Sequence, residues 1–195
     1  MDFHLSGVGF MLLFLTGLVA GFVDSIAGGG LISLPVLLSL GMPPQLALGT
    51  NKRQGSFGIL SAAATFIRKG TVSLDESVHG IIFTFMGTRP GRPKMTRNLF
   101  FTLFGLGLGF YDGFFGPGTG SFWTGGLLII MGMDMTKAAG TTRIMNFASN
   151  IVALSLFILG KNVLYSAGFC MAAGQVIGAR AGSGLAIKRG ASFIA

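Results

Sequence analysis

The chain has 195 residues, of which 51% are apolar and only 10% are charged, and its formal net charge is +8. A soluble domain carries about 25% charged residues, so this composition excludes an ordinary soluble globular protein. The cations stand in short segments between apolar runs, which predicts anchoring at a membrane surface and no nucleic-acid partner.

Long stretches without charge predict membrane-spanning helices along the chain. They are residues 5–23, 25–51, 113–133, 144–160 and 162–179. A helix needs roughly 20 apolar residues to cross the hydrocarbon core, and the stretches are continuous, so helices are expected. No Lys or Arg precedes the first stretch, which favours a retained span over a cleaved signal peptide. The expected fold class is an all-α, polytopic integral membrane protein with about six to eight membrane segments.

An acid and a run of glycines follow the first apolar stretch. Residues 21–35 read GFVDSIAGGGLISLP, in which Asp24 is followed by Gly28, Gly29 and Gly30. Glycine permits a sharp backbone path, and apolar segments interrupted in this way mark the binding sites of secondary transporters. The N-terminus of the short helix that follows attracts anions. The alternative is that these glycines only allow helices to pack closely.

The same motif recurs in the second half of the chain. Residues 21–24 (GFVD) resemble residues 109–112 (GFYD) at an offset of 88, and farther along residues 49–52 (GTNK) resemble residues 140–143 (GTTR) at an offset of 91. This ordered series predicts two homologous repeats with glycine-broken helices. Their expected bounds are residues 1–97 and 98–195.

The second glycine loop adds hydroxyl groups to the candidate site. It contains Gly116 and Gly118, followed by Thr119 and Ser121. The two hydroxyls are expected to donate hydrogen bonds to an oxyanion, or else to satisfy carbonyl groups of the loop itself.

Two acids occupy matching positions of the repeats. Asp24 and Asp112 lie within or beside apolar stretches, and an ionisable residue inside a membrane is a functional candidate. One interpretation is proton coupling, in which a desolvated carboxylate carries a proton together with an anion. The other is that each acid caps the short helix that follows. Neither acid is expected to bind an anion directly, because like charges repel.

Two cations also occupy matching positions. Lys52 follows Asn51 in the first repeat, and Arg143 ends the corresponding motif in the second. Each cation is expected either to pair with an anionic substrate or to act as a topological anchor. Arg143, Asn146 and Asn150 share one helix face, which suits a cavity wall or an interhelical contact. Because Asn146 lies beside it, Arg143 is expected to be the more sensitive cation to substitution.

These motifs give the chain a family resemblance. It resembles the sulfite exporter TauE/SafE family of membrane transporters in residues 21–35, 49–52, 109–122, 143–150 and 174–180. The resemblance implies a permease of the inner (plasma) membrane that moves small anions, typically sulfite or organosulfonates. Members of this family are usually longer. The resemblance therefore also implies a chain shortened in the middle, at residues 88–97, and at its C-terminus.

Two other functions compete with transport. Asp24 and Asp112 are also typical of an intramembrane aspartyl protease, because two carboxylates that share a proton activate water. The glycine motif that both acids head argues against this enzyme, since such repeats belong to transporters. The second alternative is a non-transporting membrane remnant, which the shortened chain suggests.

The remaining composition predicts no metal site and no cofactor. His4 and His79 stand alone, and no nucleotide-binding Gly-x-x-x-x-Gly-Lys motif occurs in the sequence. The expected partners are a small anion and the lipid bilayer. A homo-oligomer is an open alternative to a single chain in the membrane.

Overall fold

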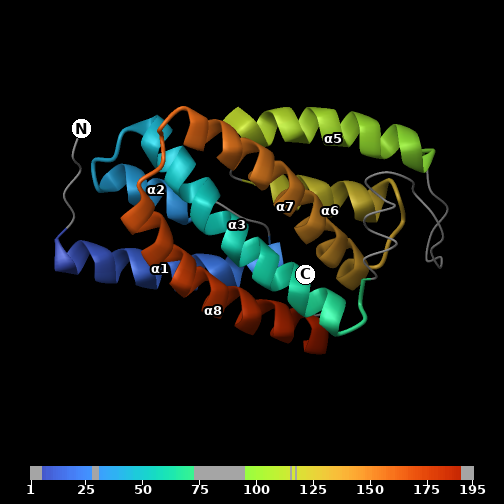
Figure 1. The fold of residues 1–195 in the computed structure, drawn as a ribbon. Coiled ribbons are helices and arrows are strands. Elements are labelled where there is room, and N and C mark those ends of the chain that lie inside the picture. Colours follow the sequence, from blue (N-terminus) through green and yellow to red (C-terminus); the bar gives the residue numbers. More distant parts are fainter. Residues whose placement is uncertain (1–5, 28–30, 73–94, 115, 117, 190–195) are drawn as a thin grey trace.

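The computed structural model describes residues 6–27, 31–72, 95–114, 116 and 118–189. All regular secondary structure in these ranges is helical, which confirms the all-α fold class. The helices are α1 (Gly7–Ala27), α2 (Ser33–Ser39), α3 (Pro44–Arg68), α5 (Arg97–Phe114), α6 (Thr119–Ile129), α7 (Met135–Leu159) and α8 (Tyr165–Arg189) (Figure 1).

Five long helices form a bundle in which neighbours in space are not neighbours in sequence. Helix α1 packs against α8, α8 against α3, α3 against α7, and α7 against α5. Figure 1 shows α1 and α8 along one side of the bundle and α5 along the opposite side. The short helices α2 and α6 lie against α3 and α7, respectively. The first and last described helices are therefore packed together.

Glycines allow α1 and α8 to approach at the level of their backbones. Gly17 and Gly21 lie one turn apart on α1, and Gly174 and Gly178 lie one turn apart on α8. A methyl group at Gly17 would overlap the carbonyl of Met171, and one at Gly178 would overlap the carbonyl of Leu18. This four-residue spacing of small residues is typical of close helix pairs in membranes.

At each predicted break one described helix ends and another begins. In the first repeat α1 ends at Ala27, residues 31–32 form a turn, and α2 begins at Ser33. In the second, α5 ends at Phe114 and α6 begins at Thr119. Gly116 and Gly118 have φ values of 77° and 86°, in the left-handed region that favours glycine. The glycines at positions 28–30 lie outside the described residues.

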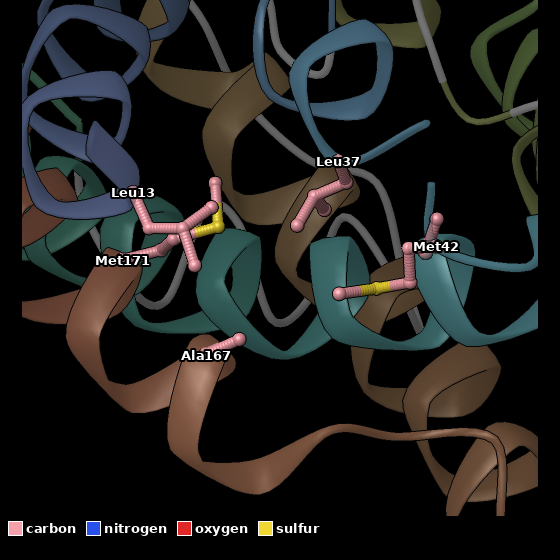
Figure 2. Packing of buried hydrophobic residues seen from close by; sticks show 6 residues of the cluster. Leu13, Leu37, Met42, Ala167 and Met171 are labelled. Atoms are coloured by element: carbon pink, nitrogen blue, oxygen red, sulfur yellow. The ribbon is translucent and has the colours of Figure 1, made fainter. Parts of the chain in front are cut away.

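A cluster of buried apolar side chains fixes α2 against the bundle. Its members are Leu13, Leu37, Met42, Ala47, Ala167 and Met171 (Figure 2). Figure 2 shows the side chains of α1, α2, α3 and α8 meeting in this cluster. Leu13 lies one turn from Gly17 on α1, and Met171 of α8 contacts Gly17 directly. The same region of packing therefore stabilises both the α1–α8 pair and the position of α2.

Two described helices are long and apolar enough to cross a membrane by composition alone. They are the segment Gly7–Ser25 of α1 and the whole of α7, Met135–Leu159. Helix α3 is as long as α7 but carries adjacent buried cations, Lys52 and Arg53, in its third turn. Polar side chains that face the bundle interior lower the mean hydropathy of a helix without exposing charge to lipid.

The bounds of α3 and α7 repeat the spacing found in the sequence. Met135 follows Pro44 by 91 residues, and Leu159 follows Arg68 by the same number. This agreement supports the division into residues 1–97 and 98–195, which stays a prediction.

Candidate functional site

A small cavity at the centre of the bundle gathers residues from six helices. Its volume is about 30 Å³. We call it the central cavity, and its lining residues are Asp24, Asn51, Lys52, Gly55, Ile59, Asp112, Gly116, Thr119, Gly120, Asn146, Asn150 and Gln175. Most of these side chains are polar, although the helices that carry them are largely apolar. Polar groups buried in this way inside a membrane bundle mark a functional site.

Asp112 accepts three hydrogen bonds in the central cavity. The Nζ of Lys52 lies 2.7 Å from its Oδ1, and the exposed fractions of the two side chains are 2% and 4%. The hydroxyl of Thr119 donates to Oδ1 at 3.0 Å, and that of Ser149 donates to Oδ2 at 2.8 Å. The acid at the end of α5 thus joins α3, α6 and α7. A charge-assisted bond at this distance is a strong one.

The glycine loop brings the backbone close to the Lys52 cation. A methyl group added at Gly116 would lie 3.5 Å from the Nζ of Lys52. Helix α6 begins directly after this loop, and its first residues, Thr119 and Gly120, line the cavity. The first N–H groups of a helix lack intrahelical partners and carry positive partial charge. One wall of the central cavity therefore combines an ammonium group with a helix N-terminus.

A second cavity lies beside the first and is lined by the other pair of buried charges, Asp24 and Arg143. We call it the Arg143 cavity; its volume is only about 10 Å³, and Asp24 and Gln175 line both cavities. The Nε2 of Gln175 donates to Oδ2 of Asp24 at 3.3 Å. Arg143 is 1% exposed, and among the described residues its Nε and Nη2 have no hydrogen-bond partner.

Each acid lies with a cation of the opposite repeat. Lys52 of the first repeat pairs with Asp112 of the second, and Arg143 of the second shares a cavity with Asp24 of the first. In both cases an acid at the end of the first long helix of one repeat faces a cation on the third helix of the other. Each buried acid thus has its counter-charge on the other half of the chain and not on its own half.

The structure brings most of the residues predicted from the sequence together. Asn51, Lys52, Gly116, Thr119, Asn146 and Asn150 line the central cavity, as do both acids. Arg143 lines the smaller cavity, Gly118 is the residue before α6, and Ser121 is exposed. Gly28, Gly29 and Gly30 lie outside the described residues.

The sequence interpretation missed two partners of the acids. Gln175 binds Asp24 and Ser149 binds Asp112. Both are polar residues on apolar helices, and Gln175 lies inside the stretch 174–180 that carries the family resemblance. A polar residue within a membrane helix is itself a signal, but the sequence does not say which acid it meets.

Interrupted helices with buried charges at the breaks, in a bundle of largely apolar helices, define the class of membrane transporters. The chain matches the family model described as "Sulfite exporter TauE/SafE" over residues 13–92 and 81–194, and it belongs to this family.

Three relatives have names that agree with this class. The "Probable membrane transporter protein" of Haemophilus influenzae is 39% identical, over 94% of this chain and 87% of its own length. The "Probable membrane transporter protein YfcA" of Escherichia coli K12 is 37% identical, over 94% and 82%. The "Probable membrane transporter protein ORF9" of a Sinorhizobium species is 36% identical, over 100% and 88%. No solved structure matches the chain.

The chain is therefore a membrane transporter and not an enzyme, and the aspartyl protease interpretation is set aside. The chain is shorter than these relatives, as expected, whereas the expected places of the shortening, at residues 88–97 and at the C-terminus, stay predictions. The match to the Sinorhizobium relative spans 233 aligned positions, whereas the chain has 195 residues, so about 38 positions of that relative have no counterpart here.

Proposed function

We propose that the chain is a secondary transporter that moves small sulfur oxyanions, such as sulfite or organosulfonates, as a multi-pass protein of the inner (plasma) membrane. The observation that carries this proposal is the buried ammonium group of Lys52, which holds an oxyanion, the carboxylate of Asp112, beside a glycine loop.

The groups that donate hydrogen bonds to the Asp112 carboxylate are equally suited to the oxygens of a sulfite or sulfonate. A sulfite or sulfonate presents several acceptor oxygens around one centre, and Lys52, Thr119 and Ser149 offer one cation and two hydroxyls from different directions. Charge-assisted hydrogen bonds to such oxygens are about twice as strong as neutral ones. The amide groups of Asn146 and Asn150 lie on the same cavity. Chloride lacks separate acceptor atoms and uses this arrangement less well.

The central cavity is small for an oxyanion substrate. About 10–15 Å³ is enough for one water molecule, so a cavity of about 30 Å³ holds about two. A sulfite ion is larger than two water molecules, so substrate entry requires the helices to move. Movement of one repeat against the other around a fixed site is the usual mechanism of such transporters.

The test is anion flux into proteoliposomes that contain the purified chain. Sulfite and methanesulfonate are expected to enter faster than chloride, and Lys52→Gln is expected to lose most of this flux. Lys188→Gln is the matched control, because Lys188 is exposed near the end of α8. Absence of flux for all three anions in the wild-type chain would instead support the non-transporting remnant.

A further inference from the structure

We infer that Asp112 is a built-in competitor for the transported anion, and that each monovalent anion enters the central cavity with one proton, which neutralises Asp112. The inference rests on the proposed function, since it concerns the same cavity. It gives the two buried acids different roles: Asp112 exchanges its partner during transport, and Asp24 stays ionised.

The carboxylate of Asp112 already occupies the place that an oxyanion needs. Its Oδ1 accepts from Lys52 and Thr119, and its Oδ2 accepts from Ser149. A substrate oxyanion requires the same three donors and cannot share them fully with Asp112. Since the central cavity holds only about two water molecules beside this carboxylate, binding of substrate requires that Asp112 give up Lys52.

The hydroxyl donors lose little when Asp112 withdraws. The hydroxyl of Thr119 has a second acceptor, the carbonyl of Gly116 at 2.9 Å. The hydroxyl of Ser149 likewise has the carbonyl of Asn146 at 3.1 Å. Each hydroxyl carries one proton and therefore alternates between the carboxylate and a backbone carbonyl. Only Lys52 needs a new anionic partner, because a buried cation without one costs several kcal/mol.

Charge balance then requires a proton. Among the described residues, the charged side chains on the two cavities are Asp24 on α1, Lys52 on α3, Asp112 on α5 and Arg143 on α7. Helices α6 and α8 contribute only neutral groups there. The two acids and two cations sum to zero, so a monovalent anion would leave one uncompensated negative charge in the bundle. A proton on Asp112 removes that charge and weakens the hold of Asp112 on Lys52.

Asp24 cannot take the same role, because its neighbour cannot change charge. An arginine side chain stays protonated in proteins, and Arg143 is 1% exposed in a cavity that it shares with Asp24. Protonation of Asp24 would leave the buried guanidinium without a counter-charge. Gln175 also holds the Asp24 carboxylate from the α8 side. The Asp24–Arg143 charges are therefore fixed, and the Lys52–Asp112 pair is exchangeable.

The transport step is balanced in protons and charge. One proton from the side on which the anion enters binds a carboxylate oxygen of Asp112, and the anion takes the place of that carboxylate on Lys52. On the opposite side the anion leaves, the proton leaves Asp112, and the Lys52–Asp112 bond forms again. No net charge crosses the membrane, and the gradients set the direction.

The experiment uses proteoliposomes with the wild-type chain and radiolabelled methanesulfonate, whose charge does not change near neutral pH. Counterflow of label against unlabelled methanesulfonate measures binding and translocation alone. An inward proton gradient of tenfold, at zero membrane potential, is expected to drive about tenfold accumulation, since one proton accompanies each anion. A pH-sensitive dye trapped in the lumen is expected to report one proton per anion.

Asp112→Asn is expected to retain counterflow with a several-fold lower apparent KM, because the internal competitor is gone, and to lose accumulation driven by the proton gradient. Lys188→Gln, at an exposed position near the end of α8 and outside both cavities, is expected to retain the gradient response. Wild-type counterflow without a gradient response or proton uptake would overturn the inference and leave the proposed function intact. Absence of wild-type counterflow would overturn the proposed function itself. If Asp112→Asn does not fold, the wild-type dye measurement decides.

Discussion

Removal of the Lys52 charge tests whether the buried ion pair holds the bundle together. In Lys52→Met the carboxylate of Asp112 keeps its two hydroxyl donors but loses the ammonium 2.7 Å away. Both side chains are nearly inaccessible to bulk solvent, and the cavity that they line holds only about two water molecules, so water replaces the lost ammonium group poorly. Breaking a buried pair by removing one partner costs about 3–5 kcal/mol, and this is the expected loss in the free energy of unfolding.

The double variant Lys52→Met/Asp112→Asn supplies the control. Neither charge is left alone in it, so it is expected to be more stable than the sum of the single losses predicts, with a coupling energy of about 2–3 kcal/mol. The assay is unfolding in mixed micelles by titration with SDS, followed by far-ultraviolet circular dichroism for all four chains. Strict additivity of the two single effects, or a loss below about 1 kcal/mol in Lys52→Met, would refute the argument.

Three further predictions follow from the site and the packing. The sequence favours Arg143 as the more sensitive cation, but Lys52 lines the larger cavity and Arg143 only the smaller one, so the expectation is reversed. Lys52→Arg is expected to raise the apparent KM for methanesulfonate about tenfold, since a planar guanidinium does not replace a compact ammonium, and Arg143→Lys is expected to raise it less. Initial flux against concentration measures both, and equal effects, or a larger effect of Arg143→Lys, would contradict this. Gly21→Leu is expected to abolish the monodisperse peak in size-exclusion chromatography, because its side chain overlaps the Gln175 carbonyl, whereas Gly109→Leu, at the matching repeat position with nothing within 4 Å, is expected to keep it. Asp134→Ala removes the side chain that caps α7 by accepting from the Lys137 amide, and is expected to cost about 1 kcal/mol in unfolding, with Asp134→Asn near wild type.

The sequence predicted which residues form the site, but not which acid pairs with which cation. Asp24, Asp112 and Lys52 stand out because ionisable residues are rare in apolar stretches, and the structure places all three on one cavity. Their pairing across repeats depends on which helices touch, and this is a tertiary property that local sequence does not carry. The sequence could therefore locate Lys52 and Arg143 at matching positions without showing that Lys52 faces the larger cavity.

Periodicity and hydropathy predicted helices but not their order in space. Residues 44–68 and 135–159 form helices of equal length, as expected for repeats. The close pairing of α1 with α8 depends on glycines that occur at four-residue spacing on both helices. On α5, Gly105 and Gly109 have the same spacing, but a methyl group added at either would meet no atom of another described element within 4 Å. The spacing alone thus does not distinguish a packed glycine stripe from an open one.

The pairing of α1 with α8 has a consequence for how the protein is made. Tyr165, where α8 begins, follows Ala27, where α1 ends, by 138 residues. At roughly 5–20 residues per second, a ribosome needs between about 7 and about 28 seconds to synthesise that interval. During this time Gly17 and Gly21 of an inserted α1 have no α8 to pack against. Assembly of the α1–α8 pair therefore waits for α8, and a nascent chain arrested before α8 presents the membrane's insertion and proteolysis machinery with an open glycine stripe.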